Sequence, residues 1–230
     1  MEVIAVGNDR YRIGAWRGDP KVGYLMPLTP SGAPGIDLAL RGLARAGYRK
    51  VVTGALGHGE QGPFLRQGFT VHERLHLLEH DLGLIPQGDK RLPIRRGRRK
   101  EKAAAIAIDQ MAFDEFWRFD EASFDEAVEA TPVSRFRVAL NRERSQLVGY
   151  AIAGRAARTG YLQRLAVDPS AQGHGVGTAL VVDTLGALRR RGVVKVLVNT
   201  QEANQSAFEL YVRLGFIPVV PGLAVLEIDL

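Results

Sequence analysis

Apolar residues recur along this chain at two spacings. Some segments place them at every second position, which predicts strands, and others at every third or fourth, which predicts helices. The turn pairs Asn8-Asp9 and Gly18-Asp19 separate the first three strands. The first half is expected to hold strands at 3–6, 11–16 and 22–28, a helix at 35–46, a strand at 49–55, a helix at 61–67 and a strand at 69–82.

The second half continues the alternation of strands and helices after a predicted linker at residues 83–91. It is expected to hold a strand near 92–96, helices at 101–117 and 121–129, strands at 134–141, 146–155 and 160–167, a helix up to 191, a strand at 193–199, a helix at 204–214 and a terminal strand. Strands that alternate with helices predict an α/β fold.

The two halves carry similar short sequences in the same order. Gly47-Tyr-Arg-Lys-Val-Val resembles Gly192-Val-Val-Lys-Val-Leu, and the pair Gly68-Phe69 resembles Gly215-Phe216. The first Gly and the Phe are 22 residues apart in the first half and 24 in the second. This spacing indicates an ancient duplication. The first copy lacks the opening strand and two helices, so we expect it to be truncated.

A glycine-rich turn separates the predicted strand at 160–167 from the helix that follows. It reads Gln172-Gly-His-Gly-Val-Gly177. Such a turn exposes backbone N–H groups, and the N-terminus of the next helix adds partial positive charge. Together they form a site for pyrophosphate. The turn therefore predicts a ligand that carries phosphate.

The second half resembles the GCN5-related N-acetyltransferase (GNAT) superfamily over about residues 92–230. The turn fits the family's Arg/Gln-x-x-Gly-x-Gly/Ala pattern, and Leu165-Ala-Val-Asp-Pro169 matches the strand before it. Asn204-x-x-Ala207-x-x-x-Tyr211-x-x-x-Gly215-Phe216 matches the family's second motif at every position. The whole chain is similar in outline to tandem-repeat acetyltransferases. The resemblance implies an α/β fold with the mixed, twisted sheet of acyl-CoA N-acyltransferase (GNAT) type, in two repeats, the first truncated.

The family resemblance also implies a donor and a set of site residues. The donor would be acetyl-CoA as co-substrate, without a metal, and Tyr211 would be the general acid that protonates the leaving thiolate. Backbone groups at 165–167 would pair with the pantetheine arm, and residues 172–178 would hold the pyrophosphate. The implied cofactor-binding residues are Leu165, Ala166, Val167, Gln172, Gly173, His174, Gly175, Val176, Gly177, Thr178, Asn204, Ala207 and Tyr211.

The residues themselves, apart from the family resemblance, also bear on Tyr211 and on His174. Asn204, Ala207 and Tyr211 are spaced by three and four, so they share one face of a helix. That face can hold a phenol near a sulfur, although a core tyrosine would show the same spacing. His174 is interpreted as an exposed loop histidine and not as a catalyst.

The group that deprotonates the amine stays open. Some relatives have a glutamate on the strand before the asparagine motif, where this chain has Asn199, and Glu202 follows in a predicted loop. A water could act instead, or one carboxylate of the set Asp114, Glu115, Asp120, Glu121, Asp125 and Glu126. Most of these are interpreted as a solvated helix face. In the aromatic cluster at 113–124, which is interpreted mainly as core, Trp117 is the best candidate for an acceptor contact.

Two further motifs match known signatures but lack the structural context these need. His72-Glu-Arg-Leu-His76 is a His-Glu-x-x-His sequence, but it lies in a predicted strand, where the two histidines would be about 13 Å apart. Gly57-His-Gly-Glu-Gln-Gly62 is a Gly-x-Gly-x-x-Gly sequence, but the repeat places it in the loop before the helix at 61–67. Neither zinc hydrolysis nor dinucleotide binding is therefore expected.

The first repeat has lost the residues that carry the chemistry. The counterpart of the glycine turn reads Leu28-Thr-Pro-Ser-Gly-Ala-Pro-Gly35, and its prolines have no N–H to donate. The counterpart of Tyr211 is Phe64, which has no proton to donate. We expect the first repeat not to bind the cofactor productively.

Composition adds limits on compartment and partners. The 230 residues include no cysteine, and 31 basic against 25 acidic residues give a net charge of +6. Seven of the basic residues lie between Arg91 and Lys102, a basic junction or an approach for an acidic ligand. There is no signal peptide and no apolar run long enough for a membrane span, so a cytoplasmic protein without membrane contact is expected.

The sequence therefore predicts a truncated, degenerate repeat at 1–86 and a complete catalytic domain at 92–230. The expected activity is direct transfer of an acetyl group from acetyl-CoA to a primary amine. The alternative is a non-catalytic acyl-CoA-binding or protein-interaction module on the same fold. The acceptor could be a small molecule, a peptide or a protein, nucleic acid is not expected as a partner, and both monomer and homodimer stay open.

Overall fold

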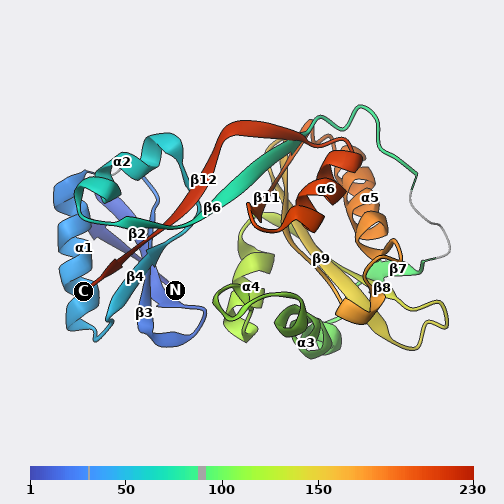
Figure 1. The fold of residues 1–230 in the computed structure, drawn as a ribbon, viewed down its shortest axis with the longest axis horizontal. Coiled ribbons are helices and arrows are strands. Elements are labelled where there is room, and N and C mark those ends of the chain that lie inside the picture. The colour runs from blue at the N-terminus through green and yellow to red at the C-terminus, as the bar shows by residue number, and fades with distance from the viewer. Residues whose placement is uncertain (31, 88–91) are drawn as a thin grey trace. The chain divides into compact units, whose positions relative to one another are not determined.

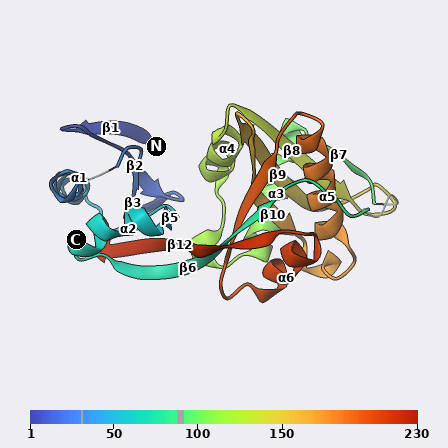
Figure 2. The ribbon, with the colours of Figure 1, turned by 90° about the horizontal axis from the view of Figure 1, so that it is seen from above.

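The computed structural model describes residues 1–30, 32–87 and 92–230. The chain divides into two compact units. Unit 1 comprises Met1–Leu77, Asn199–Asn204 and Val219–Leu230, and unit 2 comprises Leu78–Val198 and Gln205–Pro218. Figure 1 shows the helices and strands, most of them labelled, and Figure 2 shows them from above. Part of the predicted linker, residues 88–91 with Arg91, lies outside the described residues.

Unit 1 begins with an antiparallel meander that continues into a parallel pair. Helix α1 connects β3 to the parallel strand β4. The strands and helices that follow end with the terminal strand, which pairs antiparallel with β4 and β5. The elements are β1 (Glu2–Val6), β2 (Asp9–Trp16), β3 (Asp19–Pro27), α1 (Ala33–Arg45), β4 (Lys50–Thr53), β5 (Leu56–Gly57), α2 (His58–Arg66), and most of β6 (Thr70–His80) and β12 (Ile217–Asp229). Their core includes Tyr11, Leu25, Ile36, Leu43 and Phe64.

Unit 2 is a sheet in the order β7-β8-β9-β10-β11, antiparallel except for the parallel pair β10–β11. The elements are β7 (Ile94–Arg96), η1 (Arg99–Glu101), α3 (Lys102–Ala112), η2 (Glu115–Trp117), α4 (Glu121–Glu129), β8 (Val133–Leu140), β9 (Leu147–Ala156), β10 (Thr159–Val167), η3 (Pro169–Ala171), α5 (Val176–Arg189), β11 (Lys195–Gln201) and α6 (Gln205–Arg213). The three η elements are single turns of 3-10 helix.

Two apolar layers hold the helices of unit 2 to its sheet. Leu180 and Leu185 of α5 pack with Val196 of β11 in one layer. Ile106 of α3 and Phe124 of α4 pack in the other. Because both faces of β9 are covered, this strand is buried and apolar at nearly every position, whereas burial alternates along β10.

The structure confirms most predicted elements in order and corrects two. The helix predicted at 101–117 ends at Ala112, because Phe113 adopts an extended backbone and the Asp114 carboxylate caps a separate turn by accepting the Trp117 N–H at 3.2 Å. The loop predicted at Gly57–Gly62 is wrong, since α2 begins at His58 and includes most of it. The strand predicted at 69–82 is confirmed as β6. No helix in the described parts of the chain is long and apolar enough to cross a membrane.

Candidate functional site

Strands β10 and β11 pair over a short length and then separate. The parallel pairing runs from Thr159↔Lys195 to Tyr161↔Leu197. On its other edge β10 stays paired with β9 as far as Val167, with a shift of register between Leu162 and Arg164. Such a shift marks a bulge, which bends a strand. The backbone edge of β10 at 165–167 therefore has no strand partner on the β11 side among the described residues.

The glycine turn continues from this unpaired strand end into α5. Gly173 and Gly175 have φ of +76° and +80°, the left-handed region that favours glycine. Gly175 caps α5, and no side chain caps the helix N-terminus. The Gln172 side chain donates to the Val167 carbonyl at 3.2 Å, which ties the turn to β10. The first N–H groups of α5 thus lack a side-chain partner, as an anion site requires.

His174 is exposed within the turn, as expected. Its Nδ1 lies 2.8 Å from the Gln172 carbonyl oxygen, so the ring is used for local geometry. Val176 is buried in the core beneath the turn, and Thr178 is half-buried in the first turn of α5.

Gly177 brings the turn, the strand end and α6 together. A Cβ atom at this position would lie 3.3 Å from Leu210 Cδ2 of α6 and 3.7 Å from Val167 Cγ2 of β10. The first turn of α5 therefore packs closely against both elements, which places Ala207 and Tyr211 of α6 in the same neighbourhood.

Tyr211 is buried in α6, with 4% of its surface exposed. Its ring lies 5.5 Å from that of Phe216, and its hydroxyl makes no hydrogen bond to any described residue. Burial raises the pKa of Tyr211 above that of a free tyrosine, and the Arg164 cation opposes this in part. The phenol is therefore protonated at neutral pH and has a proton to donate.

Asn204 lies directly before α6, at the end of the short segment that belongs to unit 1. Its N–H donates to the Gln201 carbonyl at 3.0 Å. Glu202 lies in a turn and is exposed, as the sequence predicted, and Asn199 is exposed on β11. The structure thus gathers the other predicted site residues within unit 2 and leaves Asn204 at its boundary.

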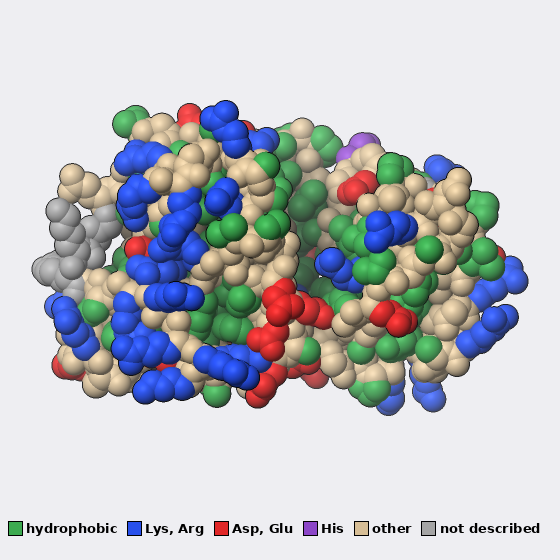
Figure 3. Space-filling model, turned by 180° about the vertical axis from the view of Figure 1, so that it is seen from behind, with side chains coloured by type: hydrophobic (Ala, Val, Ile, Leu, Met, Phe, Trp, Pro, Cys, Tyr) green, Lys and Arg blue, Asp and Glu red, His purple; other side chains and the backbone are tan. Residues whose placement is uncertain are grey.

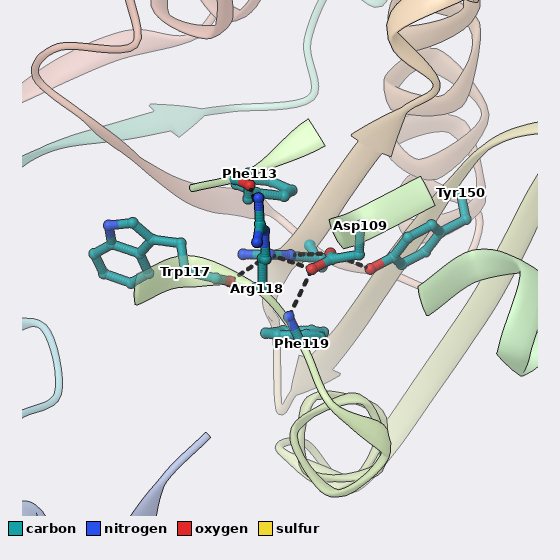
Figure 4. A network of polar contacts seen from close by, with 7 residues as sticks. Asp109, Phe113, Trp117, Arg118, Phe119 and Tyr150 are labelled. Atoms are coloured by element: carbon teal, nitrogen blue, oxygen red, sulfur yellow. Dashed lines mark hydrogen bonds and ion pairs between the residues drawn. The ribbon is translucent and has the colours of Figure 1, made fainter. Parts of the chain in front are cut away.

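A buried ion pair next to the site was missed by the sequence analysis (Figure 4). Arg164 of β10 donates from Nε and Nη2 to the two carboxylate oxygens of Asp109 of α3, both at 2.7 Å. Asp109 is fully buried and Arg164 is 8% exposed. The guanidinium lies 3.5 Å from the ring centre of Phe113 and 4.0 Å from that of Phe119. Arg164 is therefore held on both its edge and its faces.

This pair fastens residues 113–119 to strand β10. Arg164 also donates to the Trp117 carbonyl at 2.6 Å, and the Phe119 N–H donates to Asp109 at 2.7 Å. The Tyr150 hydroxyl donates to Asp109 at 2.6 Å, and burial together with the Asp109 charge raises the pKa of Tyr150. Figure 4 shows the Trp117 indole directed away from this network.

None of the candidate bases stands out by geometry. Asp109 is the one buried carboxylate among the described residues, but it already accepts four hydrogen bonds, two from Arg164, one from Tyr150 and one from the Phe119 N–H. Of the carboxylates predicted at 114–126, Asp114 and Asp120 cap helical turns and Glu121 and Asp125 pair with Lys102. Glu115 is exposed and Glu126 half-buried.

Two histidines of β6, one of them in the His-Glu-x-x-His sequence, make contacts within the protein. His72 lies 2.9 Å from Glu227, within unit 1. His80, further along β6, is buried, and its two ring nitrogens contact the Leu214 carbonyl and the Leu82 N–H. The described residues contain no group of three or more side chains able to hold a metal ion.

A sequence signal for the missed pair does exist. Arg164 is the only charged residue in the apolar strand 160–167, and Asp109 is the only one in the apolar stretch 103–112. A charge inside an apolar element needs a partner when buried. The pattern predicts that both residues are buried charges, but it does not predict that they pair with each other.

Part of the chain is similar in sequence to a known protein family. Residues 105–216 match the family described as "Acetyltransferase (GNAT) family". Residues 105–216 of this chain belong to the GNAT superfamily. The chain is therefore related to acetyltransferases, and its mixed sheet is the GNAT fold.

Curated relatives of this GNAT protein include mycothiol acetyltransferases. That of Saccharomonospora viridis is 31% identical over 135 residues, covering 51% of this chain and 42% of the relative. That of Beutenbergia cavernae is 46% identical over 63 residues, covering 27% of this chain and 21% of the relative. The match thus spans less than half the length of these curated relatives.

Solved structures share the fold over nearly the whole chain. A tandem GNAT protein from the clavulanic acid biosynthesis pathway has a TM-score of 0.69 at 16% identity, covering 99% of this chain and 81% of that one. A GCN5-related N-acetyltransferase from Kribbella flavida has a TM-score of 0.66 at 14% identity, covering 99% and 88%. At this identity the likeness concerns the fold.

Proposed function

We propose that this GNAT protein transfers an acetyl group from acetyl-CoA to a primary amine. The observation that carries the proposal is the meeting, within unit 2, of three features. These are the unpaired backbone edge at 165–167, the glycine turn of α5, which no side chain caps, and the buried, protonated Tyr211. The acetyltransferase relatives support the same class of reaction.

The residues present fit the chemistry of acetyl-CoA. The N–H groups at 173–178 would bind the pyrophosphate, because they combine free donors with the positive end of a helix. The backbone of Leu165–Val167 would pair with the amides of the pantetheine arm as an added strand does. We propose residues 92–230 as the catalytic domain and 1–86 as a truncated repeat without catalysis.

The proposed reaction is a direct transfer. The amine nitrogen attacks the thioester carbonyl carbon, a C–N bond forms and the C–S bond breaks. Tyr211 donates its phenolic proton to the departing thiolate sulfur, and the proton lost by the amine passes to water. The tyrosinate then regains a proton from solvent. No side chain is assigned as base, because Asp109 is already fully bonded.

The test measures thiol release from acetyl-CoA with a panel of primary amines that includes small molecules, peptides and proteins. We expect turnover with at least one amine, and a fall in kcat of about 100-fold or more for Tyr211→Phe, as for loss of a general acid. Calorimetry with acetyl-CoA should give the same affinity for both proteins. An unchanged kcat would overturn the role of Tyr211, and binding without turnover by any amine would favour the non-catalytic module.

The pH dependence of kcat gives a second test. Since burial raises the pKa of Tyr211, the proton-donating form persists above pH 10, the ordinary range for tyrosine. We expect kcat at saturating amine to show no decline between pH 8 and about 10. A decline in this range that disappears in Tyr211→Phe would contradict the assignment.

A further inference from the structure

A concentration of arginines lies at the end of α5 that is remote from the glycine turn. Arg189 ends this helix of 14 residues, and Arg190 and Arg191 follow it. At the rise of an α-helix the two ends are about 20 Å apart. The charges at this end are therefore not placed to bind a pyrophosphate at the turn and need another explanation.

Arginines from the sheet join this helix end. Arg135 of β8 has its pKa lowered, first by burial and then by the charges of Arg191, Arg137 and Arg190. Asp183 is the one carboxylate among the described charges that act on it, and Arg137 already engages Asp183 through two hydrogen bonds at 2.6 and 2.9 Å. The positive charge near Arg135 is thus largely uncompensated.

The pairing of strands brings in more arginines. In the β8–β9 ladder Arg155 lies opposite Val133 and Arg135 opposite Ala153, so both arginines project from one face. The Nε atoms of Arg135 and Arg155 are buried without a hydrogen-bond partner among the described residues. Arg96 of β7 lies opposite Arg137, on the same face.

The turn between β9 and β10 completes the group. The Val194 N–H donates to the Arg158 carbonyl at 2.9 Å, which holds this turn beside the chain that leaves α5. We call the whole set the arginine cluster: Arg96, Arg135, Arg137, Arg155, Arg158, Arg189, Arg190 and Arg191. Figure 3 shows Lys and Arg side chains gathered over unit 2, in the left part of the view.

The chemistry of the cluster favours a phosphate-rich partner. Crowded cations repel one another, and a polyanion removes that repulsion. The guanidinium fork of arginine matches the oxygens of a phosphate and can donate two hydrogen bonds to it. Interfaces with nucleic acid are more polar and more positively charged than protein–protein interfaces, which suits a face built from arginines.

We propose that the arginine cluster binds the phosphodiester backbone of a nucleic acid without reading its bases. This departs from the expectation that nucleic acid is not a partner, which rested on the charge concentrated at 91–102. The cluster is built from three strands, a turn and a helix end that are distant in sequence, so only the fold gathers it. Arg95 and Lys102 of the basic segment, by contrast, are neutralised by Glu101 and Asp125.

The experiment measures fluorescence anisotropy of a labelled DNA duplex against the full chain. The test variant is Arg158→Ala/Arg190→Ala/Arg191→Ala, three exposed residues of the cluster. The matched control is Arg45→Ala/Arg49→Ala/Arg66→Ala, three exposed arginines of unit 1 with the same total charge. We expect binding that weakens at least 10-fold between about 50 and 200 mM salt, and a log–log salt slope that becomes shallower by about three in the test variant.

The control variant decides whether place or total charge matters. The proposal requires affinity for DNA to fall about 10-fold or more in the test variant at low salt and to change little in the control. Equal losses in both variants, no binding at low salt, or binding of a polyglutamate peptide in preference to DNA would overturn it. Thiol release from acetyl-CoA should be the same in both variants, so a failure here is separate from a failure of the proposed acetyl transfer.

Discussion

Units 1 and 2 each contain a short helix that turns through a glycine into a buried phenylalanine. In unit 1, α2 passes through Gly68, with φ of +91°, and the Phe69 N–H donates to the Phe64 carbonyl at 3.2 Å. In unit 2, α6 passes through Gly215, with φ of +92°, and the N–H of the following residue donates to the Tyr211 carbonyl at 3.0 Å. The two turns thus have the same backbone, with Phe64 at the position of Tyr211.

The longer helices of the two units end alike as well. Gly47 follows α1 with φ of +94°, and the next N–H donates to the Leu43 carbonyl at 3.2 Å. Gly192 follows α5 with φ of +73°, and the next N–H donates to the Leu188 carbonyl at 3.3 Å. Each helix also connects two parallel strands, β3 to β4 and β10 to β11. This likeness supports the duplication predicted from the sequence.

The helix N-termini differ where the backbone is otherwise alike. In α1 the Asp9 carboxylate accepts the Gly32 N–H at 3.1 Å, and a Cβ atom at Gly35 would overlap that carboxylate. Pro34 in the first turn has no N–H. In α5 the capping Gly175 is left-handed and no side chain caps the turn. The protein's own carboxylate lies against α1, in the place where α5 is open to an external anion.

The largest expected effect comes from giving α5 what α1 has. Gly175→Asp places a carboxylate at the turn and should weaken acetyl-CoA binding by about 10- to 100-fold, the repulsion expected for like charges a few ångströms apart at a partly exposed site. Isothermal titration calorimetry with acetyl-CoA measures this.

Gly175→Asn is the matched control for shape. Asparagine has the size of aspartate and tolerates a left-handed backbone, but it carries no charge. It should bind acetyl-CoA at least 10-fold more tightly than the aspartate variant. If both variants bind equally, the turn does not hold the pyrophosphate.

A smaller effect is expected at Gly68 and Gly215, the glycines that follow α2 and α6. Alanine at Gly68 or Gly215 forces a side chain into the left-handed region, which costs about 1 kcal/mol of folding stability. A Cβ at Gly215 would also lie 3.2 Å from His80 Nε2, whereas at Gly68 its nearest neighbour is Ile228 at 3.7 Å. We expect Gly215→Ala to lower the free energy of unfolding more than Gly68→Ala, as measured by urea denaturation. The opposite order would show that the turns are held differently.

The smallest effect is expected from Asp9→Ala. It removes a carboxylate that accepts the Gly32 N–H and the Tyr11 hydroxyl, so the free energy of unfolding should fall by about 0.5 kcal/mol. Turnover of acetyl-CoA should not change, because the first repeat is proposed to play no part in catalysis. A drop in turnover at unchanged stability would give the first repeat a direct role.

Local patterns in the sequence predicted most of the fold and only part of the site. The correspondence between Gly68-Phe69 and Gly215-Phe216 could be predicted because a turn depends on residues that are neighbours in the sequence. The helix predicted at 101–117 was too long because the Asp114 cap outweighs the apolar spacing of 113–117. The Arg164–Asp109 pair joins residues 55 positions apart, and the arginine cluster joins five elements. Such long-range contacts depend on how the sheet folds, which periodicity does not report.

The Arg164–Asp109 pair has a consequence for how this protein could diverge. The pair makes two hydrogen bonds to the segment 113–119. Both involve backbone atoms, the Trp117 carbonyl and the Phe119 N–H. Any residue supplies these atoms, so the side chain at 117 can be exchanged while the segment keeps its place. New acceptors could then be acquired by substitution at position 117, while Phe113 and Phe119 keep their ring contacts with Arg164.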